Sequence, residues 1–158
     1  MPKSQKPEDS LLLEILEEGY VRKAWHGPNL RQSLRGVSAE EAAWRPAPGR
    51  HNIREIAVHA AYWKYVVRRR LCGGKRGSFT LKGSNWFLRP EDLSEKAWRA
   101  DLVLLETEHQ KLRQAFVDYQ AGKARQVPAR LLFGVALHDV YHAGQIRLLR
   151  RLCTDAKH

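Results

Sequence analysis

Apolar positions in two long segments of the chain recur at alternating steps of four and three residues. The first series is Trp98, Leu102, Leu105, His109, Leu112, Phe116 and Tyr119. The second series is Leu131, Val135, His138, His142, Gln145, Leu149 and Leu152. This spacing places the side chains of each series on one face of a helix, and such a face is what a helix buries in a bundle. The two segments therefore predict two long helices that pack against others.

A further helix is predicted to begin near Glu8 and to continue into the thirties. Its apolar stripe comprises Leu12, Ile15 and Leu16. Gly19 in the same segment would let a neighbouring helix approach closely, because glycine has no Cβ atom. Pro28 lies inside the segment, so we expect a kink or break at residues 25–28. Residues 1–8 are expected to form a flexible tail.

Capping residues predict the remaining boundaries. Asn52 is a suitable N-cap for a long helix that ends at Gly73 and Gly74, where glycine commonly supplies a left-handed stop. Residues 38–41 have the spacing of a capping box and predict a short helical turn. Residues 75–89 are rich in Gly and Ser and predict a long crossover or a lid. The fold class is therefore all-α, a four-helix bundle with a long connection between its second and third helices.

Length and composition favour a single domain over residues 1–158. The chain is 43% hydrophobic and contains five Trp residues, which is typical of a packed globule. No apolar stretch approaches the ~20 residues that span a bilayer, so no membrane association is expected. The two cysteines, Cys72 and Cys153, have no CxxC spacing, and residues 1–10 lack the apolar segment of a signal peptide. These features favour a reducing, cytoplasmic location.

A formal net charge of +11 is the most conspicuous bulk property. Such a charge can favour nucleic acid, because lysine and arginine release counterions from phosphates. However, two basic runs at residues 68–70 and 147–151 fall in the last turns of predicted helices, where cations interact favourably with the helix dipole. No zinc-finger spacing or RNA-binding aromatic motif accompanies them. Nucleic-acid binding is therefore the least favoured function.

Three polar side chains interrupt the apolar face of the last predicted helix. His138, His142 and Gln145 occupy positions where a bundle otherwise places leucine. Burying such groups without partners costs a few kcal/mol each, so something must satisfy them. Residues four apart lie one above the other on a helix, and two imidazoles so placed can hold one metal ion. His59, in the middle of the second predicted helix, is suited to supply a third ligand from a facing helix.

The same residues carry a resemblance to a known family. The relevant stretches are residues 25–30, 43–51, 57–64 and 137–146, the last of which reads LHDVYHAGQI. Together they resemble the DinB superfamily of bacterial metal-binding four-helix bundles, over nearly the whole chain. The resemblance implies an up-down-down-up bundle and a long second connection. It also implies that His59, His138 and His142 are the ligands of a divalent metal.

The resemblance leaves the reaction open. Related proteins include transferases and isomerases that use a low-molecular-weight thiol, so a metal-dependent enzyme acting on a small-molecule substrate is expected. A hydrolase of small molecules is a further option. Three imidazoles suit Zn, Ni, Co or Fe alike, and Zn is the default expectation. The ion would acidify a thiol or water at an open position.

Several other residues are candidates for the site. His26, at the expected kink, and Gln145, three residues after His142, are the candidate catalytic residues. His109 is a candidate supporting group, although a core histidine with a backbone or Glu partner is the simpler interpretation. Residues 85–86 in the long loop are candidates for closing over the site. Asp139 lies about 100° around the helix from His138, so an orienting partner for His138 is expected from another helix.

Two alternatives to an enzyme remain. One is a non-catalytic metal site that stabilises an interaction protein, with a homodimer as the expected assembly. In that case the metal would be enclosed and chelation would lower the melting temperature without removing an activity. The other is a basic nucleic-acid-binding module.

Overall fold

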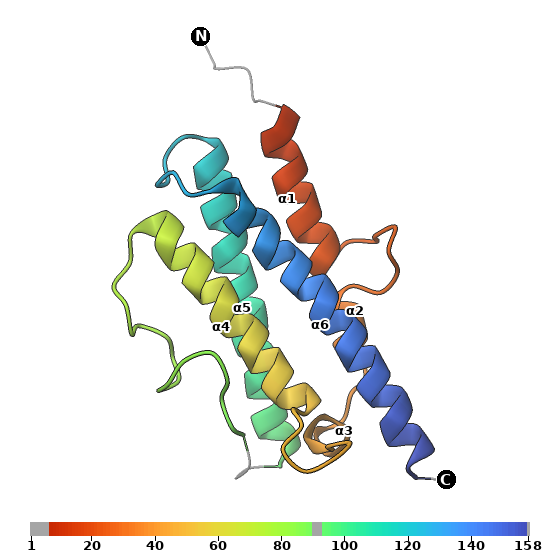
Figure 1. The fold of residues 1–158 in the computed structure, drawn as a ribbon. Helices are drawn as coiled ribbons and strands as arrows, with labels where there is room; N and C mark the ends of the chain where they lie inside the picture. The colour runs from red at the N-terminus through yellow and green to blue at the C-terminus, as the bar shows by residue number, and fades with distance from the viewer. Residues whose placement is uncertain (1–6, 90–92, 158) are drawn as a thin grey trace.

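The structure is a computed structural model that describes residues 7–89 and 93–157. This part of the chain forms six α-helices and no strand, which confirms the all-α fold class (Figure 1). The helices are α1 (Pro7–Tyr20), α2 (Leu30–Leu34), α3 (Ala39–Ala43), α4 (Ile53–Cys72), α5 (Glu95–Gln120) and α6 (Ala129–Asp155). Most of the expected N-terminal tail, residues 1–6, lies outside the described residues.

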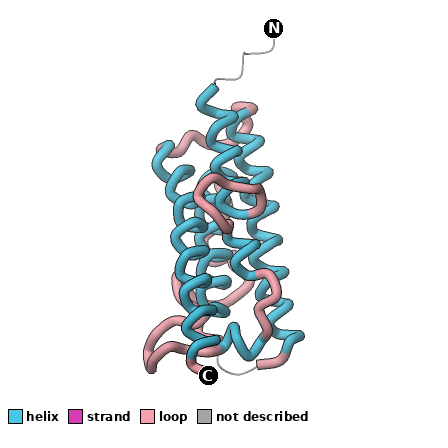
Figure 2. Tube along the Cα trace, turned by 90° about the vertical axis from the view of Figure 1, so that its right-hand side faces the viewer, coloured by secondary structure: helices cyan, strands magenta, loops and turns pink. Residues whose placement is uncertain are grey.

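Four long helices pack side by side and define the architecture. Helix α4 contacts α5 and α6, and α1 contacts the other faces of α6 and α5. In Figure 1, α4 and α5 run upward, whereas α1 and α6 run downward. Figure 2 shows the same helices edge-on as an elongated bundle. The short α2 packs on α6 and the short α3 on α4 and α5. No helix among residues 7–89 and 93–157 is long and apolar enough to cross a membrane.

The predicted first helix was too long. Helix α1 ends at Tyr20, and a loop leads to a separate helix α2 that begins at Leu30. The separation comes from Asn29, whose side chain and that of Gln32 form a reciprocal capping box at the start of α2. The Asn29 amide also donates to the carbonyl of Arg22 at 2.7 Å. Pro28 is therefore in the loop between α1 and α2, so of the expected kink or break at residues 25–28 the break is confirmed.

The other predicted boundaries are confirmed. Asn52 caps α4 by accepting from the Glu55 amide at 2.9 Å, and Gly73 ends the helix in the left-handed conformation with φ 70°. Ser38 caps α3 by accepting from the Glu41 amide. The predicted long connection is present, because no helix resumes between Cys72 and Glu95 in the described part of the chain.

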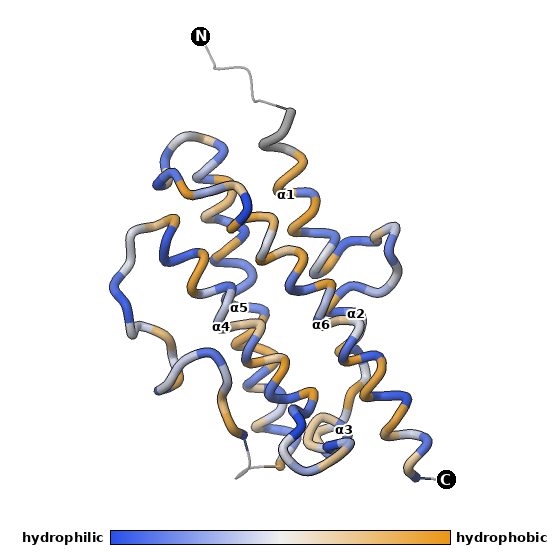
Figure 3. The backbone as a smooth tube through the Cα atoms, in the orientation of Figure 1, coloured by the Kyte–Doolittle hydropathy of each residue, from blue (hydrophilic) through white to orange (hydrophobic). Residues whose placement is uncertain are grey.

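Two apolar clusters fill the bundle, one toward each end. The first includes Tyr20, Ile56, Tyr65, Trp98, Leu105, Ile146 and Leu149, and the second includes Leu12, Leu16, Val67, Leu71, Leu112, Phe116 and Leu132. Figure 3 shows the alternation of hydrophobic and hydrophilic positions along these helices. Gly19 has the predicted role, because a Cβ atom there would lie 2.8 Å from the carbonyl oxygen of Ala136 on α6.

A buried polar layer lies between the two clusters. Lys64 of α4 and Asp139 of α6 are both 0% exposed and form an ion pair. The Lys64 ammonium is also 3.3 Å from Nδ1 of His109, whose ring stacks on Tyr20. Burial lowers the pKa of Lys64 and raises that of Asp139 to about 6, and the attraction between the two charges opposes both shifts. The layer is therefore a compensated pair of charges inside an otherwise apolar bundle.

We predict that Lys64→Met lowers the free energy of unfolding by about 3–5 kcal/mol, because it leaves Asp139 buried without a cation. The double change Lys64→Met with Asp139→Leu should recover most of that loss. Lys111→Met is the matched control, since Lys111 is half-exposed and its buried partner Glu108 keeps a second ion pair with Arg68. It should change stability by less than about 1 kcal/mol. Urea denaturation measures all three. Equal losses in the single and double variants would contradict the ion-pair explanation.

Candidate metal centre

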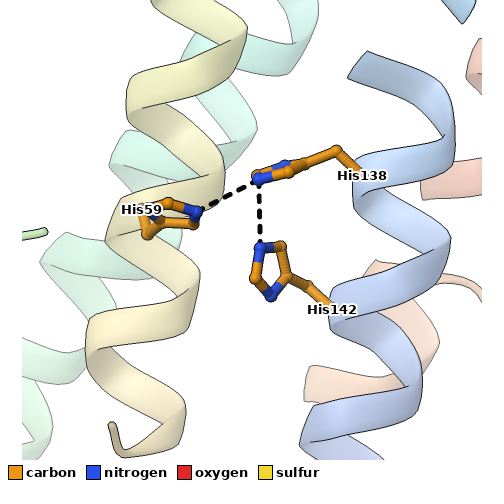
Figure 4. Close-up of side chains that lie close together, drawn as sticks. All are labelled: His59, His138 and His142. Carbon is orange, nitrogen blue, oxygen red and sulfur yellow. Dashed lines mark hydrogen bonds between the residues drawn. The ribbon is translucent and has the colours of Figure 1, made fainter. Parts of the chain in front are cut away.

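Three histidines meet between α4 and α6, as predicted. His59 projects from the middle of α4, and His138 and His142 project from successive turns of α6 (Figure 4). Nε2 of His138 lies 3.1 Å from Nε2 of His59 and 3.0 Å from Nε2 of His142. One nitrogen from each ring lies within 4.8 Å of the other two, close enough to hold one metal ion. His59 and His142 are buried, and His138 is half-buried.

Hydrogen bonds at the outer nitrogens determine which nitrogen carries the proton in the rings of His59 and His142. Nδ1 of His59 lies 2.8 Å from the backbone carbonyl oxygen of Asn85. Nδ1 of His142 lies 2.6 Å from the side-chain oxygen of Gln145. Both oxygens can only accept hydrogen bonds, so each Nδ1 must carry the proton. In the neutral rings, Nε2 of His59 and Nε2 of His142 are therefore left as lone pairs that point toward His138.

This arrangement cannot be satisfied by hydrogen bonds alone. Nε2 of His138 has at most one proton, so it can donate to only one of its two neighbours. At least one close nitrogen–nitrogen contact then has no hydrogen between its two atoms, so the lone pair of His59 or His142 meets an electronegative nitrogen that offers it no proton, which is repulsive. A cation between the three nitrogens would convert this repulsion into coordination. The donor set therefore fits a divalent metal.

The electrostatics keep all three rings neutral, which is the form that binds metal. Burial lowers the pKa of His138 to about 3, with further lowering from His142 and His59. Burial also lowers the pKa of His142 to about 4, against the opposing effect of its hydrogen bond to Gln145. The pKa of His59 is lowered by burial as well. At neutral pH the rings therefore offer lone pairs without having to lose protons first.

The long loop after α4 covers the cluster through Asn85 and Trp86. Asn85 has φ 63°, a left-handed backbone conformation that residues other than glycine rarely adopt. Its carbonyl accepts from His59, and its side-chain oxygen accepts from Nε1 of Trp63 at 3.0 Å. The Trp86 ring stacks on His59 at 3.8 Å and on His51 at 3.6 Å, with both planes nearly parallel. The loop therefore orients His59 and shields one of its faces.

Gln145 lies next to the cluster, but it acts on a ligand ring. Its oxygen accepts from His142, while its amide nitrogen donates to the hydroxyl of Tyr141 at 3.0 Å. Gln145 is therefore placed as a positioning group for His142.

The structure does not bring the other candidates to the cluster. His26 is exposed in the loop between α1 and α2. His109 is fully buried in the Lys64 layer, where Nε2 is 3.7 Å from a carboxylate oxygen of Glu17. Asp139 points away from His138, as its place on the helix predicts. The expected partner of His138 is not found, because its buried Nδ1 has no hydrogen bond to any described residue.

Sequence patterns indicated the groups that orient His59 only faintly. Asn85 and Trp86 were expected at most to close over the site, yet they make direct contact with a ligand ring. The stacking of His51 on Trp86 was not anticipated. An Asn-Trp pair in a Gly- and Ser-rich loop is the one signal that could have indicated these contacts.

Two pockets reach the cluster from opposite sides. One, of about 460 Å³, includes Trp63 and His138 among its lining residues. The other, of about 430 Å³, includes Trp86, His142 and Gln145. The cluster therefore has access to space along the helices in both directions.

Comparison with known proteins gives one match. A family model described as the DinB superfamily matches residues 23–146, a range that contains all three histidines. No curated protein and no solved structure matches the chain.

We predict that Asn85→Val weakens metal binding by about 10-fold or more, because a β-branched residue resists φ 63° and the carbonyl would turn away from His59. Asn85→Gly should retain affinity within a few-fold, since glycine keeps the backbone conformation and loses only the bond to Trp63. Competition with a chromophoric chelator measures both. Ser84→Val in the same loop is the matched control. Wild-type affinity in the Asn85→Val variant would contradict the orienting role.

Proposed function

The chain belongs to the DinB superfamily, and on that premise we propose that it is a metal-dependent enzyme whose ion is held by His59, His138 and His142. The convergence of three Nε2 atoms that cannot satisfy one another is the observation that carries the proposal. An up-down-down-up four-helix bundle is the proposed topology, and the directions of α1, α4, α5 and α6 in Figure 1 support it.

The proposed reaction is the transfer or addition of a low-molecular-weight thiol, or the hydrolysis of a small electrophile. A divalent ion at such a site supplies a lowered pKa for a thiol or water. The protein's own groups prepare the site: Asn85 and Gln145 orient two ligand rings, and Trp86 excludes water from one side of His59. Zn is the default ion, with Ni, Co and Fe as alternatives. A cytoplasmic location would supply abundant thiol.

An open coordination position distinguishes a catalytic from a structural metal site. The cluster contains three ligand residues, and no fourth His, Cys, Asp or Glu joins it among residues 7–89 and 93–157. Structural zinc sites commonly have four protein ligands, whereas catalytic sites have three and a free position. The pockets on both sides of the cluster give that position room for a small molecule. These features favour an enzyme.

A second candidate is a metal-stabilised homodimer without catalysis. One observation favours it: α6 exposes an apolar stripe of Leu137, Tyr141, Leu148 and Leu152, each at least 40% exposed. These residues lie on one face of the helix by their spacing, so a second copy has a surface on which to pack.

Nucleic-acid binding is less supported than either candidate. Arg68, in one of the two basic runs, pairs with Glu108, and Arg150, in the other, pairs with Glu41. Charges that are neutralised within the protein contribute less to phosphate binding.

We predict that untagged wild-type protein contains one divalent ion per chain and that His138→Ala loses it, because two imidazoles bind far more weakly than three. Chelation should lower the melting temperature of the wild type and leave that of His138→Ala unchanged. Elemental analysis and thermal unfolding measure these effects. His26→Ala is the matched control and should retain its metal. Wild-type protein that stays metal-free after supplementation with Zn, Ni, Co and Fe would refute the proposal.

The enzyme and dimer candidates are separated by two further measurements. Loaded wild-type protein should accelerate thiol addition to a small electrophile, or hydrolysis of one, relative to His138→Ala. Leu152→Glu should leave that rate unchanged, because Leu152 is exposed and lines neither pocket. If instead no acceleration is found, and Leu152→Glu converts a dimer to a monomer in sedimentation, the non-catalytic candidate holds.

A further inference from the structure

A pocket between α4 and α6 combines an apolar wall with an unpaired cationic rim. Its wall includes Trp63 and Val67 of α4 and Leu131 of α6, and His138 of the cluster lies at its inner end. Arg70 of α4 and Arg130 of α6 also line it, and no Asp or Glu does. We call this cavity of about 460 Å³ the Arg70–Arg130 pocket.

The two arginines of this pocket differ from the arginines that are paired within the protein. Arg45, Arg68, Arg89, Arg113 and Arg150 each form an ion pair with a carboxylate. Arg70 and Arg130 are exposed and have no hydrogen bond or ion pair to any residue that the structure describes. Two guanidinium groups that line one cavity without a carboxylate partner keep their donors available for charge-assisted hydrogen bonds to an anion.

The start of α6 adds to the positive character of the pocket. Pro128, which lines the pocket, is the N-cap of α6 and provides no side-chain hydrogen bond, and no acidic residue lies in the first turn. The Leu131 amide donates to the Pro128 carbonyl at 2.9 Å, and with no acidic side chain in the first turn the positive end of the helix dipole at Pro128 is not neutralised. This field reinforces the two arginines.

We propose that the Arg70–Arg130 pocket binds the substrate as an amphipathic anion. Its carboxylate or phosphate lies on Arg70 and Arg130, its apolar body lies on Trp63 and Val67, and its reactive end lies at His138. Arg130 and His138 are eight residues apart on α6, which corresponds to about 12 Å along the helix axis. A body the size of a phenylalkanoate spans this distance once the arginine side chains reach inward. This assignment rests on the proposed function, since it names the substrate class of that site.

The test uses three probes with the same 3-phenylpropyl group. These are 4-phenylbutyrate, 3-phenylpropyl phosphate and the neutral 4-phenylbutyramide, titrated by calorimetry into metal-loaded protein. The wild type should bind an anionic probe saturably and at least 10-fold more tightly than the amide, because charge-assisted bonds to guanidinium are lost with the amide. The relative affinity of the carboxylate and the phosphate identifies which anion the arginines prefer. Absence of saturable anion binding would overturn the proposal.

Two charge-matched double variants test whether the anion binds at Arg70 and Arg130. Arg70→Gln with Arg130→Gln should weaken anion binding at least 10-fold and leave binding of the amide unchanged. Arg147→Gln with Arg151→Gln removes the same charge from exposed positions of α6 outside the pocket, and it should have no effect. Equal weakening in both pairs would show a non-specific effect of net charge and would overturn the proposal.

A steric variant provides an independent test. Gly134 lines the pocket, and a Cβ atom there would meet nothing within 4 Å, so Gly134→Leu fits the fold while filling the cavity. It should abolish binding of all three probes. Gly144→Leu is the matched control, because it is on the same helix with equally open space and outside the pocket. Unchanged probe binding in Gly134→Leu would overturn the proposal.

Failure of this inference is distinguishable from failure of the proposed function. Metal content is measured on every variant, and the arginine and glycine variants should keep wild-type stoichiometry. His138→Ala should lose metal yet still bind the anionic probe through the arginines. If metal-loaded protein does not bind the anionic probes, only the assignment of the pocket is refuted. If the wild-type protein binds no metal, the proposed function is refuted.

Discussion

Facing imidazole lone pairs are the constraint on which the site depends. The Asn85 carbonyl and the Gln145 oxygen hold protons on the outer nitrogens of His59 and His142, so the inner nitrogens have none to share. His138 meets both of them and can satisfy only one. Burial lowers the pKa of each ring, so protonation does not relieve the conflict at neutral pH. A cation between the three Nε2 atoms would relieve this repulsion. Asn85 and Gln145 orient two of the rings for such a cation.

Helix α6 connects this site to the stability of the bundle. His138 and Asp139 are neighbours in sequence but point to different faces, one toward the cluster and the other toward Lys64. The ion pair between Lys64 and Asp139 is fully buried, so it strongly disfavours any rotation or sliding of α6 against α4. Since both ligand-bearing helices contribute to this pair, it also fixes the distance between His59 and the two histidines of α6.

The long connection after α4 has a structural role at the same place. Phe79 and Phe87 anchor the connection in the apolar core. Asn85 and Trp86, which lie between these two residues in sequence, contact His59. The left-handed backbone at Asn85 lets one residue serve two partners, because its carbonyl meets His59 while its side chain meets Trp63. The Gly- and Ser-rich loop thus completes the surroundings of His59.

Sequence alone determined the helices after residue 50 and the three histidines, because helical periodicity, caps and the i, i+4 spacing are local properties. It did not determine the end of α1. The capping box of Asn29 starts a separate helix, and the hydrogen bond from the Asn29 side-chain amide to the Arg22 carbonyl holds the loop between the two helices. Sequence alone also could not reveal that His26 stays exposed, that Lys64 and Asp139 pair, or that Asn85 orients His59. These contacts join residues that are distant in the chain or depend on a loop path, and only tertiary packing brings them within reach of each other.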